Sequence, residues 1–357
     1  MEKLILAINP GSTSTKFGLY RDDENIFDET IRHSTDDLSD FNTVSEQFSF
    51  RKKLIMEELR KRNIKIDGIK AVVGRGGLLK PIESGVYEVN ELMKKDLKSG
   101  ERGEHASNLG GLIADSIAGD IPGSKAFIVD PVVVDEMDDV ARLSGHPLIQ
   151  RRSIFHALNQ KAVARTYAGK INREYEDMNL IVAHMGGGIS VGAHVNGRVL
   201  DVNNALNGDG PFSPERAGSL PAGQLVQLCF SGEYTEDEVM KMLTGKGGMV
   251  AYLDTNNFKD ICKRAAEGDE KARLVQQASS YQVGREIAAA AATMRGRVDA
   301  IILTGGMAHQ DSHTDYIRRM VEFIAEVIIF PGEDELKSLA QSGKLAIDNR
   351  VRIKEYS

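Results

Sequence analysis

Residues 4–20 read LILAINPGSTSTKFGLY, and this stretch decides the fold. The apolar run Leu4–Ile8 ends at Asn-Pro-Gly, and apolar residues resume at Phe17–Tyr20, which predicts a strand, a turn and a second strand. The same order returns in the second half, where Leu180–Ala183 precedes a glycine turn and the alternating run Ile189–Val195. The two copies lie about half the chain apart, so we expect a duplicated domain.

Strand and helix patterns alternate outside these two stretches. Helices are predicted at 46–62, 107–117, 157–170 and 271–295, and further strands at 69–73, 126–129 and 300–303. This alternation predicts an α/β fold with mixed sheets flanked by helices. Because the repeat restarts before residue 180, we place a first domain at 1–148 and a second at 149–330.

Composition limits the classes of partner. The chain has 357 residues, which favours two domains with a cleft between them. A net charge of -7 leaves no basic surplus for a nucleic-acid backbone, and the short apolar run at the N-terminus is neither a signal peptide nor a membrane span. The two cysteines, Cys229 and Cys262, lack metal-ligand spacing and suit a reducing compartment. We therefore expect a cytoplasmic protein without nucleic-acid or membrane partners.

Three small-residue turns are candidate ligand loops. The first, NPGSTSTK at 9–16, offers backbone amides, hydroxyl groups and Lys16 to a phosphate, although such a turn is also typical of a plain hairpin. The GxxxxGK[ST] spacing of a Walker loop is missing. The matched turn His184–Ser190 in the second half strengthens the phosphate interpretation, because two glycine turns could hold one polyphosphate. The third, Thr304-Gly305-Gly306, has a bare backbone that could lie against adenine.

Eight ordered motifs resemble the acetate and butyrate kinases, within the superfamily of sugar kinases, actin and heat-shock chaperone ATPases. They are NPGSTSTK (9–16), RGG (75–77), DPVVVDEM (130–137), RRSIFH (151–156), AHMGGGIS (183–190), PERAGSLP (214–221), LTGGMAH (303–309) and PGEDEL (331–336). GEHASNLGG (103–111) and DPVVVDEMDDVARLSGHP (130–147) are similar to the butyrate branch.

The resemblance implies two actin-like (ribonuclease H-like) domains, with residues 331–357 packing back on the first, and with ATP, Mg²⁺ and an acid meeting in the cleft. It also implies a homo-oligomer, a dimer or larger. The residues that it assigns to ATP are Asn9, Gly11, Ser12, Thr13, Ser14, Lys16, His184, Gly186, Gly187, Gly188, Gly305 and Gly306. The metal is assigned to Asn9, Asp130 and Glu335, with Glu335 the less secure match, and the transferred phosphoryl group to His156 and Arg216.

The sequence departs from the acetate kinases at residues 71–77. Those enzymes carry HRVVHGG where this chain has AVVGRGG. An ungapped match leaves Val72 where the family has its carboxylate-binding arginine, so Arg75 becomes the candidate clamp, since a guanidinium can grip two oxygens. Gly74 stands in place of an acetate-lining valine. We therefore expect Gly74, together with Phe155, to line a larger acyl pocket.

The chemistry agrees with these residue types. Phosphoryl transfer needs cations and hydrogen-bond donors placed in advance, and a carboxylate acceptor needs no general base because it is already ionised at neutral pH. We expect reversible phosphorylation of butyrate by ATP. Acetate, propionate and branched-chain acids are the alternative substrates, and a nucleotide-switched binding protein of the actin or chaperone kind is the alternative class. An iron-sulfur ATPase activator would need a cluster pair of cysteines.

Overall fold

The computed structural model describes residues 3–357 of the chain, which divide into two compact units. The first contains the residues up to Val134 and the C-terminal segment Asp334–Ser357, and the second is Asp135–Glu333. The expected boundary after residue 148 thus lies inside the second unit. Within the described residues, no helix is both long enough and apolar enough to cross a membrane.

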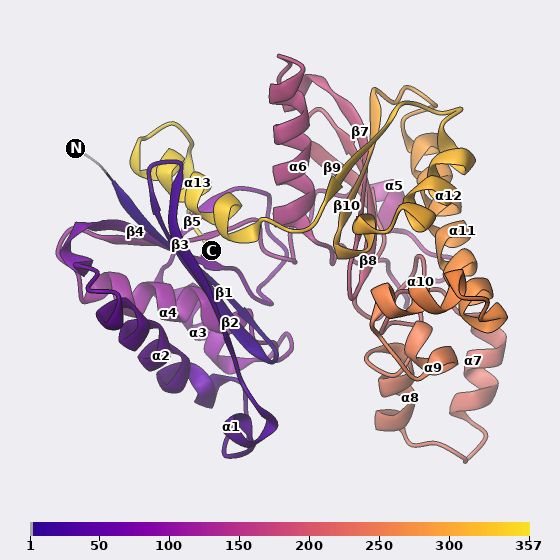
Figure 1. Ribbon diagram of the computed structural model, residues 1–357, viewed down its shortest axis with the longest axis horizontal. Coiled ribbons are helices and arrows are strands. Elements are labelled where there is room, and N and C mark those ends of the chain that lie inside the picture. The colour runs from indigo at the N-terminus through magenta and orange to yellow at the C-terminus, as the bar shows by residue number, and fades with distance from the viewer. Residues whose placement is uncertain (1–2) are drawn as a thin grey trace. The chain divides into compact units, whose positions relative to one another are not determined.

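The first unit is built on a mixed sheet in the order β12-β5-β6-β4-β1-β2-β3 (Figure 1). β1 pairs antiparallel with β2 and parallel with β4, and β4 pairs parallel with β6. The strands are β1 (Leu4–Gly11), β2 (Ser14–Arg21), β3 (Glu24–Arg32), β4 (Ile69–Arg75), β5 (Val86–Glu88), β6 (Lys125–Val129) and β12 (Ile353–Lys354).

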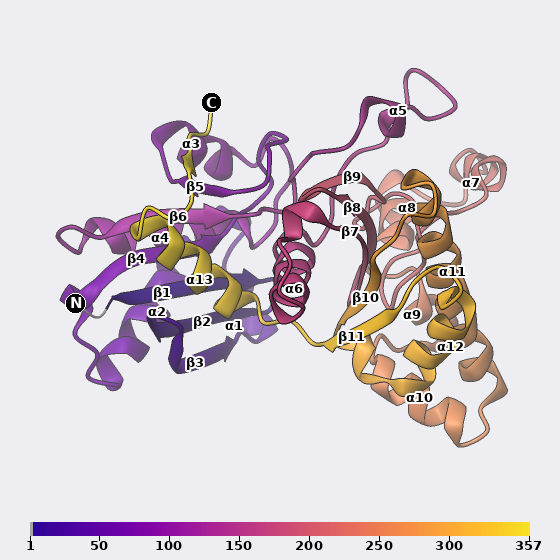
Figure 2. The same cartoon turned by 90° about the horizontal axis from the view of Figure 1, so that it is seen from above.

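Helices cover both faces of this sheet, because its central strands are apolar on both sides. The helices are α1 (Thr35–Ser39), α2 (Phe48–Lys61), α3 (Glu91–Ser99), α4 (Asn108–Gly119) and α13 (Glu335–Ile347), with single 3-10 turns at Ser45–Gln47 and Ile66–Gly68. α2 and α4 lie on one face and α13 on the other (Figures 1 and 2). Leu6, Ile8 and Val72 belong to the core on the α4 side of the sheet. Ile5 faces α13 on the other side, where a Cβ on Gly343 would stand 3.4 Å from it. Neighbouring residues of a strand point to opposite faces, so Ile5 and Leu6 face different helices.

The second unit repeats this plan with the order β11-β10-β7-β8-β9. Its strands are β7 (Asn179–Met185), β8 (Ile189–Val195), β9 (Arg198–Val202), β10 (Ala300–Gly305) and β11 (Val327–Pro331). Its helices are α5 (Asp139–Arg142), α6 (Ala157–Lys170), α7 (Ala222–Cys229), α8 (Glu236–Leu243), α9 (Met249–Leu253), α10 (Phe258–Ala266), α11 (Glu270–Thr293) and α12 (Asp311–Val321), with 3-10 turns η3 (Tyr175–Asp177) and η4 (Gly306–His309). α6 covers one face of the sheet, and α11 with α12 covers the other (Figure 2).

The duplication is confirmed by matching topology. In each unit an antiparallel three-stranded meander is followed by a strand that returns parallel to the first. The helix predicted at 157–170 is confirmed with the same bounds. β1 differs from its prediction, because it continues through Asn9 and Pro10 to Gly11, and Gly11 pairs with Ser14. Only Ser12 and Thr13 therefore form the turn of the first hairpin.

Candidate functional site

Three candidate residues of the first unit lie at the carboxyl ends of neighbouring strands. Asn9 follows Ile8, which pairs with Gly74 of β4, and Arg75 ends β4 opposite Val129 of β6. Asp130 comes directly after β6. Since β4 lies between β1 and β6, Asn9 and Asp130 are separated by two strand spacings, roughly 10 Å. The strand ends thus form one polar edge, the usual place for a ligand in a parallel sheet.

Glu335 joins this edge from the far end of the sequence. It is the first residue of α13 and is 6% exposed. Its Oε2 accepts from the amide of Asn9 and lies 3.2 Å from Nη1 of Arg75, and the same Nη1 donates to Asn9 Oδ1 at 3.4 Å. The structure therefore brings Asn9, Arg75 and Glu335 together. The hydrogen bonds described for Arg75 use Nη1. The Nε and Nη2 groups form the opposite edge of the guanidinium, and this edge could donate to a ligand.

Asp130 is held in an unusual backbone conformation. Its φ is 37°, in the left-handed region that non-glycine residues rarely adopt, and its side chain is buried. Oδ1 accepts from Ser84 Oγ at 2.6 Å and from the backbone N–H of Gly85 at 2.8 Å. Backbone strain of this kind persists where the surroundings enforce it, often at functional sites. These bonds are also what a turn aspartate makes, so the metal assignment of Asp130 stays a prediction.

Arg51 organises the first hairpin turn and was not predicted. It lies on α2, is fully buried, and donates from Nη1 to the carbonyls of Gly11 and Ser14, both at 2.8 Å, and from Nη2 to the carbonyl of Ser12 at 3.1 Å. Nη1 also donates to Thr15 Oγ1 at 3.0 Å. The turn residues Ser12 and Thr13 are exposed, as is Lys16. A sequence signal exists, because Arg51 occupies an i, i+4, i+8 row with the core residues Ile55 and Leu59.

Gly74 has a packing reason to be glycine. A Cβ at Gly74 would stand 2.1 Å from the carbonyl oxygen of Gly110 on α4, closer than any side chain can approach. The space beside Gly74 is therefore filled by the backbone of α4. The presence of glycine is explained by this close contact, and its place in an acyl pocket stays a prediction. Phe155, the other expected pocket residue, is 2% exposed and immediately precedes His156.

Two histidines stack at the end of β7 in the second unit. The rings of His156 and His184 lie 3.8 Å apart between centroids at an angle of 15°. His156 Nδ1 hydrogen-bonds Ser190 Oγ at 2.9 Å, and His184 Nδ1 hydrogen-bonds Asn159 Oδ1 at 2.8 Å. His184 Nε2 lies 3.1 Å from Glu333 Oε1, close enough for an ion pair when protonated but not aligned as a hydrogen bond.

Arg216 lies against the glycine turn that connects β7 and β8. A Cβ at Gly188 would stand 2.0 Å from Arg216 Nη1, so the guanidinium needs a glycine there. Nη1 also donates to the carbonyl of Ala205. Ser213 links the same two segments, because its Oγ donates to the carbonyl of Gly187 at 2.6 Å and accepts from the N–H of Arg216 at 3.1 Å.

The remaining glycines border the same strand ends. A Cβ at Gly186 would stand 3.1 Å from Glu333 Oε1 and 3.2 Å from His184 Nε2. Gly305 ends β10 with a φ of 91°, and a Cβ there would meet the carbonyl oxygen of Met185 at 2.4 Å, so only glycine fits. Gly306 has open space beside its Cα. The second unit thus brings His156, His184, the glycine turn, Arg216 and Gly305–Gly306 to one edge of its sheet.

The oxygen donors of the first unit suit a hard cation. Asn9, Asp130 and Glu335 supply amide and carboxylate oxygens, which Mg²⁺ prefers. Within residues 3–357, no three His, Cys, Asp or Glu side chains are gathered as a metal site. Mg²⁺ does not require one, because it keeps several waters and binds through one or two carboxylates plus phosphate oxygens. The residues present therefore fit Mg²⁺ that arrives with a nucleotide.

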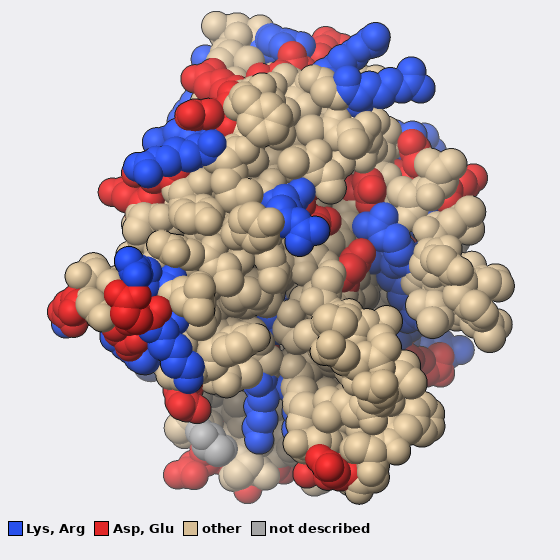
Figure 3. Space-filling view, turned by 90° about the vertical axis from the view of Figure 1, so that its right-hand side faces the viewer, with Lys and Arg blue, Asp and Glu red and all other residues tan. Residues whose placement is uncertain are grey.

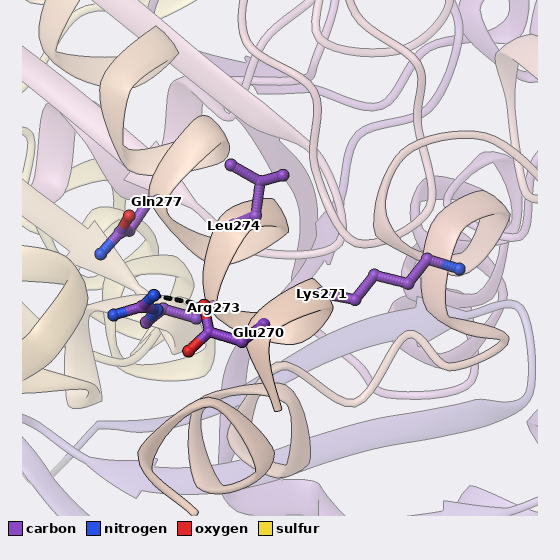
Figure 4. Close-up of a pocket in the computed structure, with 5 residues that line it drawn as sticks. All are labelled: Glu270, Lys271, Arg273, Leu274 and Gln277. Atoms are coloured by element: carbon purple, nitrogen blue, oxygen red, sulfur yellow. Dashed lines mark hydrogen bonds and ion pairs between the residues drawn. The ribbon is translucent and has the colours of Figure 1, made fainter. Parts of the chain in front are cut away.

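Other surface features contain none of the candidate residues. A hollow at the start of α11 is lined by Glu270, Lys271, Arg273, Leu274 and Gln277, with an ion pair between Arg273 and Glu270 (Figure 4). All five side chains are exposed. On the face shown in Figure 3, basic side chains lie among acidic ones and neither sign covers the face.

Comparison with known proteins shows the family of the chain. Residues 124–348 match the model of the acetokinase family. The chain is 56% identical over 356 residues to butyrate kinase 2 of Clostridium acetobutylicum, covering 100% of both chains. It is 54% identical over 352 residues to butyrate kinase 1 of the same organism, covering 99% of both.

Solved structures share the fold at low identity. The acetate kinase of Porphyromonas gingivalis superposes with a TM-score of 0.78 at 18% identity, covering 97% of this chain and 100% of that one. A propionate kinase from Francisella tularensis superposes with a TM-score of 0.76 at 17% identity, covering 95% and 98%. The expected actin-like α/β fold is thereby confirmed.

Proposed function

The chain belongs to the acetokinase family, and from that membership we propose that it phosphorylates butyrate with ATP to give butyryl phosphate and ADP. It is a phosphotransferase with a carboxyl group as acceptor. A carboxylate oxygen of butyrate attacks the γ-phosphorus, and the bond from that phosphorus to the β,γ-bridging oxygen breaks as ADP leaves. The reaction is reversible, because the acyl phosphate can return the group to ADP. No proton has to be removed, since butyrate is ionised at neutral pH.

The observation that carries the proposal is the convergence of His156, His184 and Arg216 on the glycine turn of the second unit. During transfer, negative charge spreads over the equatorial oxygens of the phosphoryl group. Donors and cations that are already in place stabilise that charge without reorganisation. We assign Arg216 and His156 to those oxygens, and the backbone of Gly186–Gly188 to the phosphates of the nucleotide.

The first unit supplies the acid and metal contacts in this proposal. Arg75 binds the butyrate carboxylate through Nε and Nη2, while Nη1 stays on Glu335 and Asn9, which fixes the plane of the guanidinium. Asn9, Asp130 and Glu335 would hold Mg²⁺ directly or through its waters. When bound, Mg²⁺ neutralises charge on the phosphate oxygens.

The hairpin turns complete the proposed nucleotide contacts. The first turn, with Ser12, Thr13, Ser14 and Lys16, would meet phosphate oxygens, and Gly305–Gly306 would lie against adenosine because Gly306 has open space beside its Cα.

We also propose that the protein forms a homo-oligomer. Several large apolar side chains are largely exposed, among them Leu148 (87% exposed) and Phe230 (86%), and association would remove apolar surface of this kind from water. Light scattering after size exclusion measures the state, and a monomer at all concentrations would refute it.

Trapping of the acyl phosphate tests the function. The purified protein is incubated with ATP, Mg²⁺ and hydroxylamine together with acetate, propionate, butyrate, isobutyrate or valerate in turn, and hydroxamate is measured. We expect butyrate to give the highest kcat/KM, with Arg216→Ala as the control of strongly reduced activity. If no acid yields hydroxamate while ATP still binds, the chain is not a carboxylate kinase. If another acid is preferred, butyrate is the wrong substrate.

A further inference from the structure

A row of buried polar side chains lies behind His156. It consists of Ser190 and His194 on β8, Gln160 on α6 and Tyr175 in η3, all between 0% and 2% exposed. Ser190 contacts Gln160, Gln160 contacts His194, and His194 contacts Tyr175, all at hydrogen-bond distance. Ser190 also contacts His156. None of them has a role in the function proposed above. Because most of these groups can either donate or accept, the direction of each bond has to be worked out.

The amide of Gln160 sets the direction. One of its terminal atoms lies 3.0 Å from the backbone carbonyl of Ser190 and 2.8 Å from Ser190 Oγ. A carbonyl can only accept, so this atom is the NH₂ group and not the amide oxygen. Gln160 Oε1 therefore faces His194 Nε2, at 2.9 Å. Since Oε1 can only accept, Nε2 of His194 carries a hydrogen.

His194 itself is neutral. It is completely buried, and burial together with the charges of Lys161 and Arg165 holds the pKa of its imidazole well below the ordinary value. A neutral ring with its hydrogen on Nε2 has a lone pair on Nδ1. Tyr175 therefore donates its hydroxyl hydrogen to His194 Nδ1, at 2.7 Å.

The hydrogen bonds of Ser190 determine which nitrogen of His156 carries the hydrogen. Its Oγ accepts from Gln160 Nε2 at 2.8 Å and from the backbone N–H of His156 at 3.4 Å. Both lone pairs are then engaged, and the hydroxyl hydrogen is left to donate to His156 Nδ1 at 2.9 Å. Nδ1 is thus an acceptor, and the neutral imidazole of His156 carries its hydrogen on Nε2.

We propose that Gln160 and His194 are positioning residues that act through Ser190 to hold His156 as a hydrogen-bond donor at Nε2. Phosphoryl oxygens only accept, so this tautomer attracts them, whereas a lone pair at Nε2 would repel them. The stack on His184 fixes the ring plane, and the polar row fixes which nitrogen donates. The catalytic consequence rests on the role given to His156 in the proposed function, but the tautomer itself does not.

The test compares variants that remove or keep the hydrogen-bonding groups at positions 160 and 194. Gln160→Met has a similar shape without polar atoms, and we expect kcat for butyryl phosphate formation to fall about tenfold to a hundredfold with little change in either KM. His194→Gln keeps a donor near the position of Nε2 and should retain more activity than His194→Leu. His313→Leu is the matched control, because His313 is also buried and bonds a serine, Ser280, at 2.7 Å in the same unit. It should leave kcat unchanged.

Nitrogen-15 NMR of the imidazoles gives a readout that loss of stability alone would not move. In the parent protein we expect His156 to be protonated on Nε2 with an unprotonated, hydrogen-bonded Nδ1. In Gln160→Met the Nδ1 resonance should shift or a second tautomer should appear. A proton on Nδ1 in the parent would overturn the proposal, as would normal kcat and an unchanged spectrum in Gln160→Met. If Gln160→Met does not fold, equal activity of His194→Gln and His194→Leu refutes it. A parent protein that makes no acyl phosphate refutes the proposed function, while the NMR result still decides the tautomer.

Discussion

Replacing Arg51 by methionine removes the guanidinium that hydrogen-bonds the first hairpin turn. We expect this change to disorder the turn while the free energy of unfolding of the protein changes little. Arg51 is fully buried, and its partners within residues 3–357 are neutral oxygens: three backbone carbonyls, Thr15 Oγ1 and the amide oxygen of Gln47. Burial lowers the pKa of the guanidinium from 12.5 to about 10, so keeping the charge costs on the order of 3 kcal/mol. Losing the bonds also costs about 3 kcal/mol, at ~1 kcal/mol for each of the three backbone carbonyls, because the side chains of Thr15 and Gln47 can rotate to other partners.

These two effects nearly cancel, so Arg51→Met should change the free energy of unfolding by less than about 2 kcal/mol. The turn at Ser12 and Thr13 should nevertheless lose its order. Ordering it again when the nucleotide binds costs roughly 1–3 kcal/mol, which raises KM for ATP about tenfold to a hundredfold. Arg51→Lys keeps the buried charge with fewer donors, and should be less stable than Arg51→Met.

Hydrogen exchange of the backbone amides of residues 11–15, denaturant unfolding and initial rates against ATP measure the three quantities. Arg60→Met is the matched control, because Arg60 lies exposed on the same helix. Unchanged amide exchange in Arg51→Met would refute the idea that Arg51 orders the turn. Faster exchange with an unchanged KM would show that the turn does not contact the nucleotide.

Four further outcomes are expected. Arg216→Ala should lower kcat by about 10² to 10⁴-fold with little loss of ATP binding, checked by initial rates and calorimetry. Asp130→Asn should need more Mg²⁺ for half-maximal rate, and an unchanged Mg²⁺ curve with full activity contradicts the metal role. Gly74→Val should destabilise the first unit by at least about 3 kcal/mol, because its Cβ would stand 2.1 Å from a carbonyl oxygen of α4, and butyrate and acetate activities should fall together. A selective loss of butyrate activity would support a place for Gly74 in the acyl pocket. Burial lowers the pKa of His313 from 6.5 to about 3, so the unfolded chain takes up a proton that the folded one does not. His313 should then contribute a fall in stability of ~1.4 kcal/mol per pH unit as pH drops below about 6.5, and His313→Asn should remove that contribution from the slope in denaturant titrations, while the contribution of His194 stays.

Local patterns were enough to predict much of the fold. The hairpins at 4–20 and 180–195, the helix α6 and the strands at 69–73 and 300–303 were predicted from apolar periodicity and turn residues, because these properties act between neighbours in the chain. The parallel pairing of those two strands was seen only in the structure. The exact length of the first turn was missed, since backbone pairing carries β1 through Asn-Pro-Gly. Motif resemblance indicated Arg216, His156 and the glycine turn, and the structure gathers these three at the end of one hairpin.

Contacts between distant segments were decided only by the tertiary structure. Arg75 meets Glu335 across 260 positions of sequence, and its guanidinium geometry follows from that contact. The sequence indicates no packing reason for Gly74, and the close approach of α4 supplies one, while the place of Gly74 in an acyl pocket stays a prediction. Arg51 and Gln160 resemble ordinary helix residues in the sequence, and only the folded chain places Arg51 beneath a turn and Gln160 between a serine and a histidine. Periodicity and turn chemistry are local and can be read along the chain, whereas the direction of a buried hydrogen bond depends on which groups the packing brings face to face.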